Sequence, residues 1–285
     1  MDVSEVKVCV LRIEGTNCEA ESAQVFDHLG ACAELVHLNQ ILGKDVDQVE
    51  RRELMDYNIL MIPGGFSSGD YIRAGAILAA RIKGTLKDQL KEFVEDGRPV
   101  LGVCNGFQVL VELGLLPAFS QTMTHFPTAI LSNNDSNRYE CRPTLLRHES
   151  KGKCVFTKKL PKDRVIMCPS AHAEGKFLFP KDEQETLFQE LVDQDQLVFR
   201  YVDSDGELAG YPYNPNGSYM NIAGICNPQG NVFGMMPHPE RSFFRYQHHD
   251  WTRVCPILND KGPQDIPGDG RVVFESVLEH VCSKF

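Results

Sequence analysis

The chain has 285 residues, and 42% of them are hydrophobic, which suffices for the core of one large domain or two small ones. Its net charge of −10 and its sequence pI of about 5.4 argue against binding to nucleic acid. The sequence shows no apolar run of membrane-spanning length and no N-terminal signal pattern, so we expect a cytoplasmic protein that does not enter a membrane.

The ten cysteines include no Cys-x-x-Cys pair. In a chain that alternates strands with helices and lacks a secretion signal, this spacing favours free thiols over disulfides. We therefore expect no metal site and no cofactor bound to this chain.

Strand and helix patterns alternate through the first half of the chain. Apolar runs predict strands at 7–12, 33–38, 58–62 and 99–103. Helical periodicity covers 19–29 and 71–96, and each stretch ends at a glycine, Gly30 and Gly97. The alternation predicts an α/β fold with a mostly parallel central sheet and helices on both faces.

The second half contains shorter strand patterns at 165–167, 197–202 and 231–235, with a hairpin turn expected at 203–206. We interpret them as mixed or antiparallel additions to the same sheet. Since no linker divides the chain, residues 1–285 are expected to form a single three-layer domain. Residues 242–270 have little periodicity and are interpreted as an inserted loop before a final helix at 271–284.

A Gly-x-Cys-x-Gly pattern surrounds Cys104, where a predicted strand meets a helix. This pattern is the cysteine form of a nucleophile elbow, a sharp turn in which flanking glycines avoid steric clashes. The sulfur would then lie at a helix N-terminus, and the backbone N–H of Asn105 would point toward a developing oxyanion. A buried, inert cysteine would show the same short pattern.

His238 and Glu240 provide the missing parts of a catalytic set. Pro237 and Pro239 flank the histidine and are expected to keep the backbone extended, so that both side chains face the same way. A carboxylate beside an imidazole fixes its tautomer, and the imidazole can accept a thiol proton. The sequence therefore predicts Cys104 as nucleophile, His238 as base and Glu240 as its orienting group.

A second His-x-Glu pair, His172 and Glu174, has the same spacing as His238 and Glu240. Spacing alone does not decide which pair serves Cys104.

The segments around Cys104 (Cys-Asn-Gly-Phe-Gln, 104–108) and His238 (Pro-His-Pro-Glu, 237–240) resemble those of the class I, or triad, glutamine amidotransferases. Three further segments are similar to the glutaminase subunits of phosphoribosylformylglycinamidine synthases, a family of purine biosynthesis. These are 15–19 (Gly-Thr-Asn-Cys-Glu), 63–71 (Pro-Gly-Gly-Phe-Ser-Ser-Gly-Asp-Tyr) and 214–218 (Asn-Pro-Asn-Gly-Ser). The matches extend from about residue 7 to 245, in order.

This resemblance implies a flavodoxin-like amidotransferase fold and a glutaminase that releases glutamate and ammonia from glutamine. It implies an oxyanion hole formed by backbone N–H groups of Gly65, or its neighbour, and Asn105. Gln108 matches a glutamine-binding position, and Arg138 and Tyr139 are expected near the amino-acid end of the substrate.

The resemblance also favours His238 over His172 as the base, since His172 matches a loop near the mouth of the site and the partner. The segments at Asn17, His172 and Asn216 are expected to gather around that mouth, because strand-end loops cluster there. With Glu174, these residues are expected to face the partner and couple the two activities.

The partner implied by the family is a synthetase that uses ATP and Mg²⁺ to convert formylglycinamide ribonucleotide to formylglycinamidine ribonucleotide. This chain lacks a Gly-x-x-x-x-Gly-Lys-Ser/Thr phosphate loop, so we expect the synthetase to be a separate chain, with a small third subunit possible. The alternatives are another triad amidotransferase, a stand-alone cysteine amidohydrolase or peptidase, and a non-catalytic binding module.

Overall fold

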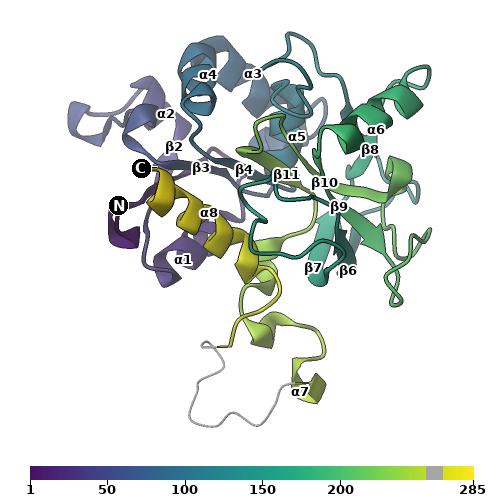
Figure 1. Cartoon of the computed structure of the whole chain (residues 1–285). Helices are drawn as coiled ribbons and strands as arrows, with labels where there is room; N and C mark the ends of the chain where they lie inside the picture. Colours follow the sequence, from purple (N-terminus) through teal and green to yellow (C-terminus); the bar gives the residue numbers. More distant parts are fainter. Residues whose placement is uncertain (255–265) are drawn as a thin grey trace.

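A computed structural model describes residues 1–254 and 266–285 of the chain. One mixed nine-stranded sheet crosses the molecule in the order β2-β1-β3-β4-β11-β10-β9-β6-β7 (Figure 1). A second sheet pairs β5 with β8. The strands are β1 Lys7–Arg12, β2 Cys32–His37, β3 Ile59–Ile62, β4 Val100–Val103, β5 Ile130–Ser132, β6 Glu140–His148, β7 Val165–His172, β8 Lys176–Leu178, β9 Leu197–Val202, β10 Ile222–Cys226 and β11 Val232–Met235.

The parallel half of the sheet is formed by β2, β1, β3, β4 and β11. Every residue of β3, β4 and β11 is buried. Parallel strands covered on both faces are expected to be continuously apolar, as these are. The carboxyl ends of β1, β3 and β4 meet at one edge, which brings the segments at Asn17, Gly65 and Cys104 together as expected.

The antiparallel half continues from β11 through β10, β9, β6 and β7. The predicted additions to the main sheet are therefore confirmed, although antiparallel pairings are as numerous as parallel ones. The sequence did not indicate β6, which lies between β9 and β7. Its Pro143, paired with Pro169, removes a backbone donor and makes the segment look unlike an interior strand.

The described helices pack on both faces of the sheet, as the three-layer prediction requires. Helices α3, α4 and α5 cover one side, and α1 and α8 lie side by side on the other (Figure 1). The α-helices are α1 Glu19–His28, α2 Leu38–Leu42, α3 Ala76–Thr85, α4 Lys87–Glu95, α5 Asn105–Glu112, α6 Gln184–Asp193, α7 Trp251–Val254 and α8 Arg271–Lys284.

Two local predictions are wrong. The helix expected at 71–96 is divided into α3 and α4 at Leu86, and it cannot start earlier because Ile72 and Gly75 have positive φ angles. The chain does turn at 203–206, where the N–H of Gly206 donates to the carbonyl of Asp203. However, the next strand begins only at Ile222, since a loop with the 3-10 helix η5 (Tyr219–Asn221) intervenes, so this turn closes no hairpin.

The segment expected as an inserted loop, 242–270, contains short helices in its described part: the end of η6 (Pro239–Ser242), η7 (Arg245–Gln247) and α7. Its two ends meet, because the N–H of Gly268 donates to the carbonyl of Phe243 at 2.7 Å. Residues 255–265 lie outside the described residues. Within the described ranges, no helix combines the length and apolar character needed to cross a bilayer.

Candidate active site

Cys104 occupies a sharp turn between β4 and α5. The φ and ψ angles of Cys104 are 52° and −108°, a conformation that L-residues rarely adopt. Cys104 is 6% exposed. The flanking glycines are required by close backbone approach, since a Cβ on Gly102 would lie 2.6 Å from the carbonyl oxygen of Gly106. A Cβ on Gly106 would overlap the carbonyl of Ile62. The turn therefore has the geometry expected of a nucleophile elbow.

His238 follows β11 and its ring is hydrogen-bonded to Glu240. The distance from Nδ1 to Glu240 Oε1 is 2.5 Å, and both side chains are buried. Because a carboxylate accepts, Nδ1 carries the proton and Nε2 is left as the basic nitrogen. The expected extended backbone is found at His238 but does not continue to Glu240, because Pro239 begins the 3-10 helix η6. Glu240 lies in η6, from which its carboxylate reaches the His238 ring.

The charge state of His238 reflects its neighbours. Burial alone would lower its pKa, but Glu240, Cys104 and Cys18 outweigh burial and raise the pKa well above its ordinary value. The imidazolium form is therefore stabilised at this position, which suits a histidine that receives a proton from a thiol.

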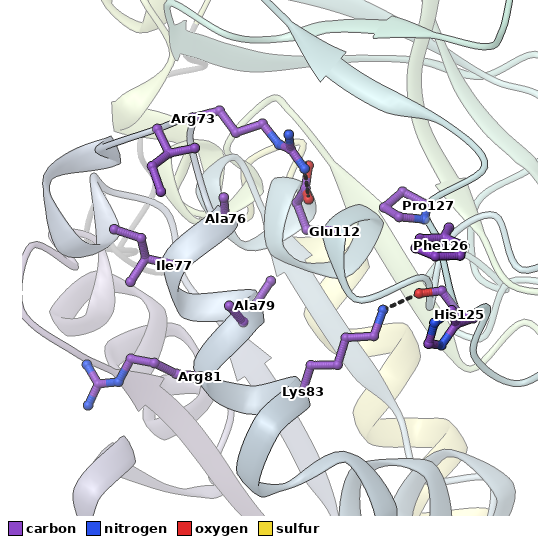
Figure 2. A pocket seen from close by; sticks show the side chains of 12 residues that line it. Arg73, Ala76, Ile77, Ala79, Arg81, Lys83, Glu112, His125, Phe126 and Pro127 are labelled. Carbon is purple, nitrogen blue, oxygen red and sulfur yellow. Dashed lines mark hydrogen bonds and ion pairs between the residues drawn. The ribbon is translucent and has the colours of Figure 1, made fainter.

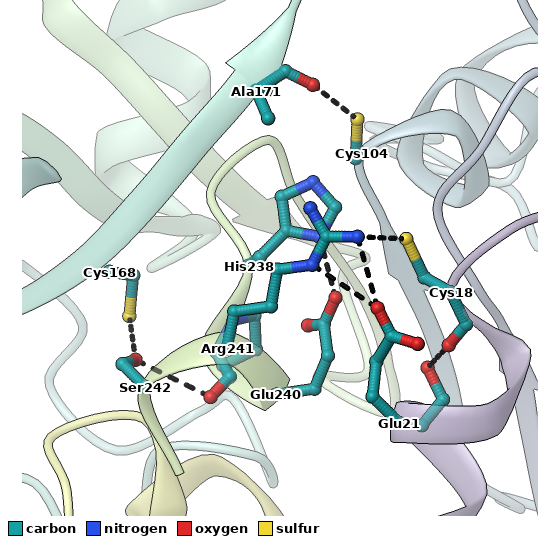
Figure 3. Close-up of polar contacts among 11 residues, drawn as sticks. Cys18, Glu21, Cys104, Cys168, Ala171, His238, Glu240, Arg241 and Ser242 are labelled. Atoms are coloured by element: carbon teal, nitrogen blue, oxygen red, sulfur yellow. Dashed lines mark hydrogen bonds and ion pairs between the residues drawn. The ribbon is translucent and has the colours of Figure 1, made fainter. Parts of the chain in front are cut away.

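Gly64 separates the nucleophile from the base. A Cβ at this position would lie 2.8 Å from His238 Cε1, 3.2 Å from Cys18 Sγ and 3.3 Å from Cys104 Cβ. Because Gly64 has no side chain, the side chains of Cys104, His238 and Cys18 can approach one another. Figure 3 shows the Cys104 sulfur above the His238 ring, where it donates to the carbonyl of Ala171 at 3.6 Å.

The predicted oxyanion donors lie beside the elbow. Gly65 has a φ of +140° and forms an isolated bridge with Thr16, while the N–H of Phe66 donates to the carbonyl of Gly15 at 2.8 Å. Among the described residues, none accepts a hydrogen bond from the N–H of Gly65 or Asn105. Both donors are therefore uncommitted, whereas the N–H of Phe66 is not.

The side chain of Asn105 ties the elbow to the loop that carries Gly65. Its Oδ1 accepts from the N–H of Ser67 at 3.3 Å, and its Nδ2 donates to Asp70 Oδ1 at 3.2 Å and to Gln108 Oε1 at 2.9 Å. Burial, followed by the nearby Glu174, raises the pKa of Asp70 to about 6. Asn105 thus fixes the loop through two contacts, to Ser67 and Asp70, while its third contact joins it to Gln108 within α5.

Gln108, expected at the substrate, is buried, and its Nε2 donates to the carbonyl of Glu174 at 2.6 Å. The Glu174 carboxylate in turn accepts from the N–H of Ala74 at 3.0 Å. The structure therefore brings together the elbow helix, the loop after β3 and the loop after β7, because Glu174 accepts from Gln108 through its carbonyl and from Ala74 through its carboxylate.

His172 and Glu174 do not form a second base-and-orienter pair. No hydrogen bond or ion pair joins them among the described contacts, and Glu174 is used by Ala74. Asn216 Nδ2 donates to His172 Nε2 at 3.0 Å, since Asn216 Oδ1 already accepts from Ser218. Burial lowers the pKa of His172 to about 3, so this histidine is neutral.

The expected partner-facing residues differ in exposure. Asn17 is exposed, Glu174 is half-buried, and His172 and Asn216 are buried. The buried side chains of His172 and Asn216 therefore support the loops at the mouth and are not available for contact with a partner. Among the expected substrate contacts, Arg138 is exposed, and half-exposed Tyr139 lies at the mouth with its ring centroid 6.4 Å from that of Phe66.

Three residues of the site were not predicted to have a role: Cys18, Glu21 and Arg241. Arg241 Nη2 donates to Cys18 Sγ at 3.1 Å and to Glu21 Oε1 at 3.0 Å (Figure 3). Cys18 belongs to a segment that carries the family resemblance, 15–19, and Arg241 directly follows another, 237–240, which is the signal that could have drawn attention to them. Glu21, in the first turn of α1, has no such signal.

Donor atoms of Cys18, His238 and Glu240 lie within 4.8 Å of one another, a set that suits zinc. The Arg241 guanidinium, however, donates to the Cys18 sulfur and places a positive charge beside it. A second cation there would meet electrostatic repulsion, so these residues fit a proton-transfer centre better than a metal site.

A surface hollow of about 760 Å³ lies away from this centre, against α3 and residues 125–127 (Figure 2). It is crossed by the Arg73–Glu112 ion pair and by Lys83, whose Nζ donates to the carbonyl of His125. It contains none of the catalytic candidates, but its rim includes Ile72, which is 88% exposed and belongs to the loop at the mouth.

Comparison with known proteins gives one consistent result. The family model of CobB/CobQ-like glutamine amidotransferase domains matches residues 5–280. A phosphoribosylformylglycinamidine synthase subunit PurQ from Archaeoglobus fulgidus is 51% identical over 283 residues, which cover 99% of each chain. A PurQ from Picrophilus torridus is 47% identical, covering 91% of this chain and 95% of the relative.

Among solved structures, a chain of PurLQS from Thermotoga maritima superposes with a TM-score of 0.70 at 28% identity. The superposition covers 97% of this chain and 99% of that one. The similarity therefore spans the whole fold as well as the catalytic segments.

Proposed function

The chain belongs to the CobB/CobQ-like glutamine amidotransferase family, and we propose that it is the glutaminase subunit of a phosphoribosylformylglycinamidine synthase. The observation that carries this proposal is the arrangement around Gly64: a cysteine on a strained elbow faces a buried histidine whose ring is held by a glutamate. PurQ relatives, similar over nearly their full length, support the choice of substrate system.

Catalysis begins when the Cys104 thiolate attacks the carboxamide carbon of glutamine. His238 holds the proton taken from the thiol, and its raised pKa favours this imidazolium. It then passes the proton to the leaving ammonia and activates water to release glutamate from the thioester. Glu240 keeps Nδ1 protonated, so that Nε2 is the nitrogen that exchanges protons.

The tetrahedral oxyanion is stabilised by the N–H groups of Gly65 and Asn105. Each donor of this kind contributes about 2.7–4 kcal/mol to transition-state stabilisation. Two contacts of the Asn105 side chain, to Ser67 and Asp70, hold the donor loop in place, and its third contact links it to Gln108, which is assigned to the substrate side of the same network. Arg138 and Tyr139 are assigned to the amino-acid end of glutamine.

Ammonia is passed to a synthetase on a separate chain, which uses ATP and Mg²⁺ to amidate formylglycinamide ribonucleotide. The similar Thermotoga maritima chain comes from an assembly named PurLQS, which supports a synthetase partner and a small third subunit. We assign the complex to the cytoplasm, where the free thiols found at the described cysteines are stable.

The docking surface for the synthetase is assigned to the exposed apolar side chains around the mouth. Phe66, Tyr71 and Ile72 belong to the loop after β3, and Tyr139 lies opposite; they are 47%, 74%, 88% and 51% exposed. Large exposed apolar groups gathered at one site are typical of protein interfaces. Asn17 borders this surface, while His172 and Asn216 support it from below.

The test is to purify the chain with its natural synthetase and to measure glutamine-dependent amidation of formylglycinamide ribonucleotide. Glutamine hydrolysis by the isolated chain is expected to be low and to rise when the synthetase and its nucleotide ligands are added. Full hydrolysis by the isolated chain, unchanged by the partner, would instead identify a stand-alone amidohydrolase.

A further inference from the structure

Cys18 lies beside the catalytic histidine without being the nucleophile. Its sulfur, a ring nitrogen of His238 and a carboxylate oxygen of Glu240 all lie within 4.8 Å of one another. The residue is 2% exposed, and burial raises the pKa of its thiol, so at neutral pH it is a protonated thiol inside the site. Burial on this scale beside a reacting group calls for a structural explanation.

The backbone of Cys18 is fixed on both sides. Its N–H donates to the carbonyl of Gly64 at 3.2 Å, and its own carbonyl accepts from the N–H and the Oγ of Ser22 at 3.1 and 2.6 Å. Cys18 is also the N-cap residue of α1, directly before its first residue, Glu19. The backbone that carries the sulfur is therefore held rigidly. It is hydrogen-bonded directly to Gly64, which lies between the nucleophile and the histidine.

Arg241 fixes the sulfur from the other side. Its guanidinium donates to Cys18 Sγ at 3.1 Å and is itself held by Glu21 through Nε and Nη2, at 3.2 and 3.0 Å (Figure 3). Arg241 directly follows Glu240 in η6. The contact thus ties the start of α1 to the segment that carries both His238 and Glu240.

We propose that Cys18 is a positioning residue for His238: its sulfur, held by Arg241, confines the imidazole to the orientation that faces Cys104 and supports its protonated form. This inference rests on the proposed glutaminase function. With Gly64 on one edge of the ring, Glu240 at Nδ1 and Cys18 beside them, the imidazole has little room to turn.

Removal of the sulfur is expected to change both the geometry and the charge balance. The change leaves a space of about one sulfur atom beside the imidazole ring. It also removes the acceptor that Arg241 has near Glu240. A guanidinium free to pair with Glu240 would compete with His238 for that carboxylate and would disfavour the imidazolium. The titratable and charged groups around His238 are Cys18, Cys104, Tyr139, Cys168, His172, Glu240 and Arg241.

The experiment compares Cys18→Ala and Cys18→Ser with the natural sequence in the complex with the synthetase. Cys18→Ala is expected to lower kcat for glutamine hydrolysis about tenfold while KM changes less than about twofold, because ring placement matters mainly in the transition state. The alkaline limb of the kcat profile, where the imidazolium loses its proton, is expected to move about half a pH unit lower. Cys18→Ser, which keeps an acceptor for Arg241, is expected to recover most of both effects.

Cys9→Ala is the matched control. Cys9 is another buried cysteine, on the strand β1 that precedes Cys18, and its thiol makes no hydrogen bond to a site residue in the described part of the chain. This variant is expected to lower thermal stability with an unchanged kcat and pH profile. If the natural complex does not hydrolyse glutamine, the proposed function fails. If the natural complex does hydrolyse glutamine, two results would each show that the positioning role is wrong. One is a Cys18→Ala complex with the natural kcat and pH profile, and the other is a Cys18→Ser complex that recovers none of the lost kcat or of the pH shift.

Discussion

Gly64 offers a direct test of how closely the nucleophile and the base must approach. Its φ lies outside the left-handed region, so alanine is compatible with the backbone there. The added methyl group would lie 2.8 Å from His238 Cε1, about 0.7–1.2 Å inside an ordinary carbon–carbon contact. The protein can relieve this overlap only by moving the ring, the sulfur of Cys18 or the loop itself.

The kinetic cost follows from that displacement. A misplacement of about 1 Å in a catalytic group can lower the rate by about 10²-fold, which corresponds to about 2.7 kcal/mol in the activation free energy. Overpacking a buried site costs about 1–3 kcal/mol of folding stability, so the variant should remain folded. We therefore expect Gly64→Ala to lose about two orders of magnitude in kcat for glutamine hydrolysis.

The assay is glutamine hydrolysis by the complex, with synthesis from added ammonia measured in parallel to show that the synthetase remains active. Gly84→Ala is the matched control, because a Cβ on Gly84, within α3, meets no atom within 4 Å. This control should keep full activity. A Gly64→Ala complex that hydrolyses glutamine within about twofold of the natural rate would refute the steric reasoning.

Three further predictions follow from the site. Cys104→Ala and His238→Ala should abolish glutamine use while ammonia-dependent synthesis survives, and a glutamine-mimicking electrophile should label Cys104; labelling of another cysteine would contradict the assignment. Because the pKa of His172 is lowered to about 3 in the folded chain, the unfolded chain binds more protons below the ordinary pKa of about 6.5. Stability should therefore fall as pH drops from about 6.5 toward 3, and His172→Leu should flatten this loss in pH-dependent melting curves. Ile72→Asp should weaken association with the synthetase without unfolding the chain, whereas Val49→Asp, at an equally exposed site on η2 (Gln48–Glu50), should not; equal binding by both would exclude Ile72 from the interface.

The elements found from the sequence are those with uniform local signals. The buried strands of the parallel half are continuous apolar runs, and the glycines around Cys104 mark a turn that only close backbone contacts explain. Gly30 ends α1 with a φ of +89°, as a C-terminal glycine should. Local composition at these places marks the elements directly, although the contact that requires Gly106, with Ile62 on β3, is visible only in the structure.

The elements that were missed lack such signals. Strand β6 alternates buried and exposed residues irregularly and contains Pro143, and it is held in place by β7 and β9 through pairings with segments up to about sixty residues away. The extended backbone expected through Glu240 was wrong because Pro239 favours the first position of a 3-10 turn as readily as an extended strand. In both cases the tertiary context decides between local alternatives.

The contact between Cys18 and Arg241 could not be found from the sequence, and the reason is topological. Cys18 and Arg241 are separated by 223 positions in the chain. They meet because β1 and β11 lie in the same parallel half, with β3 and β4 between them, so the segments that follow β1 and β11 leave the sheet at the same edge. The same edge holds Gly64, after β3, and Cys104, after β4. The strand order thus brings all four segments to one edge of the sheet, where His238 lies, and the contact between Cys18 and Arg241 joins the two of them that are farthest apart in the sequence.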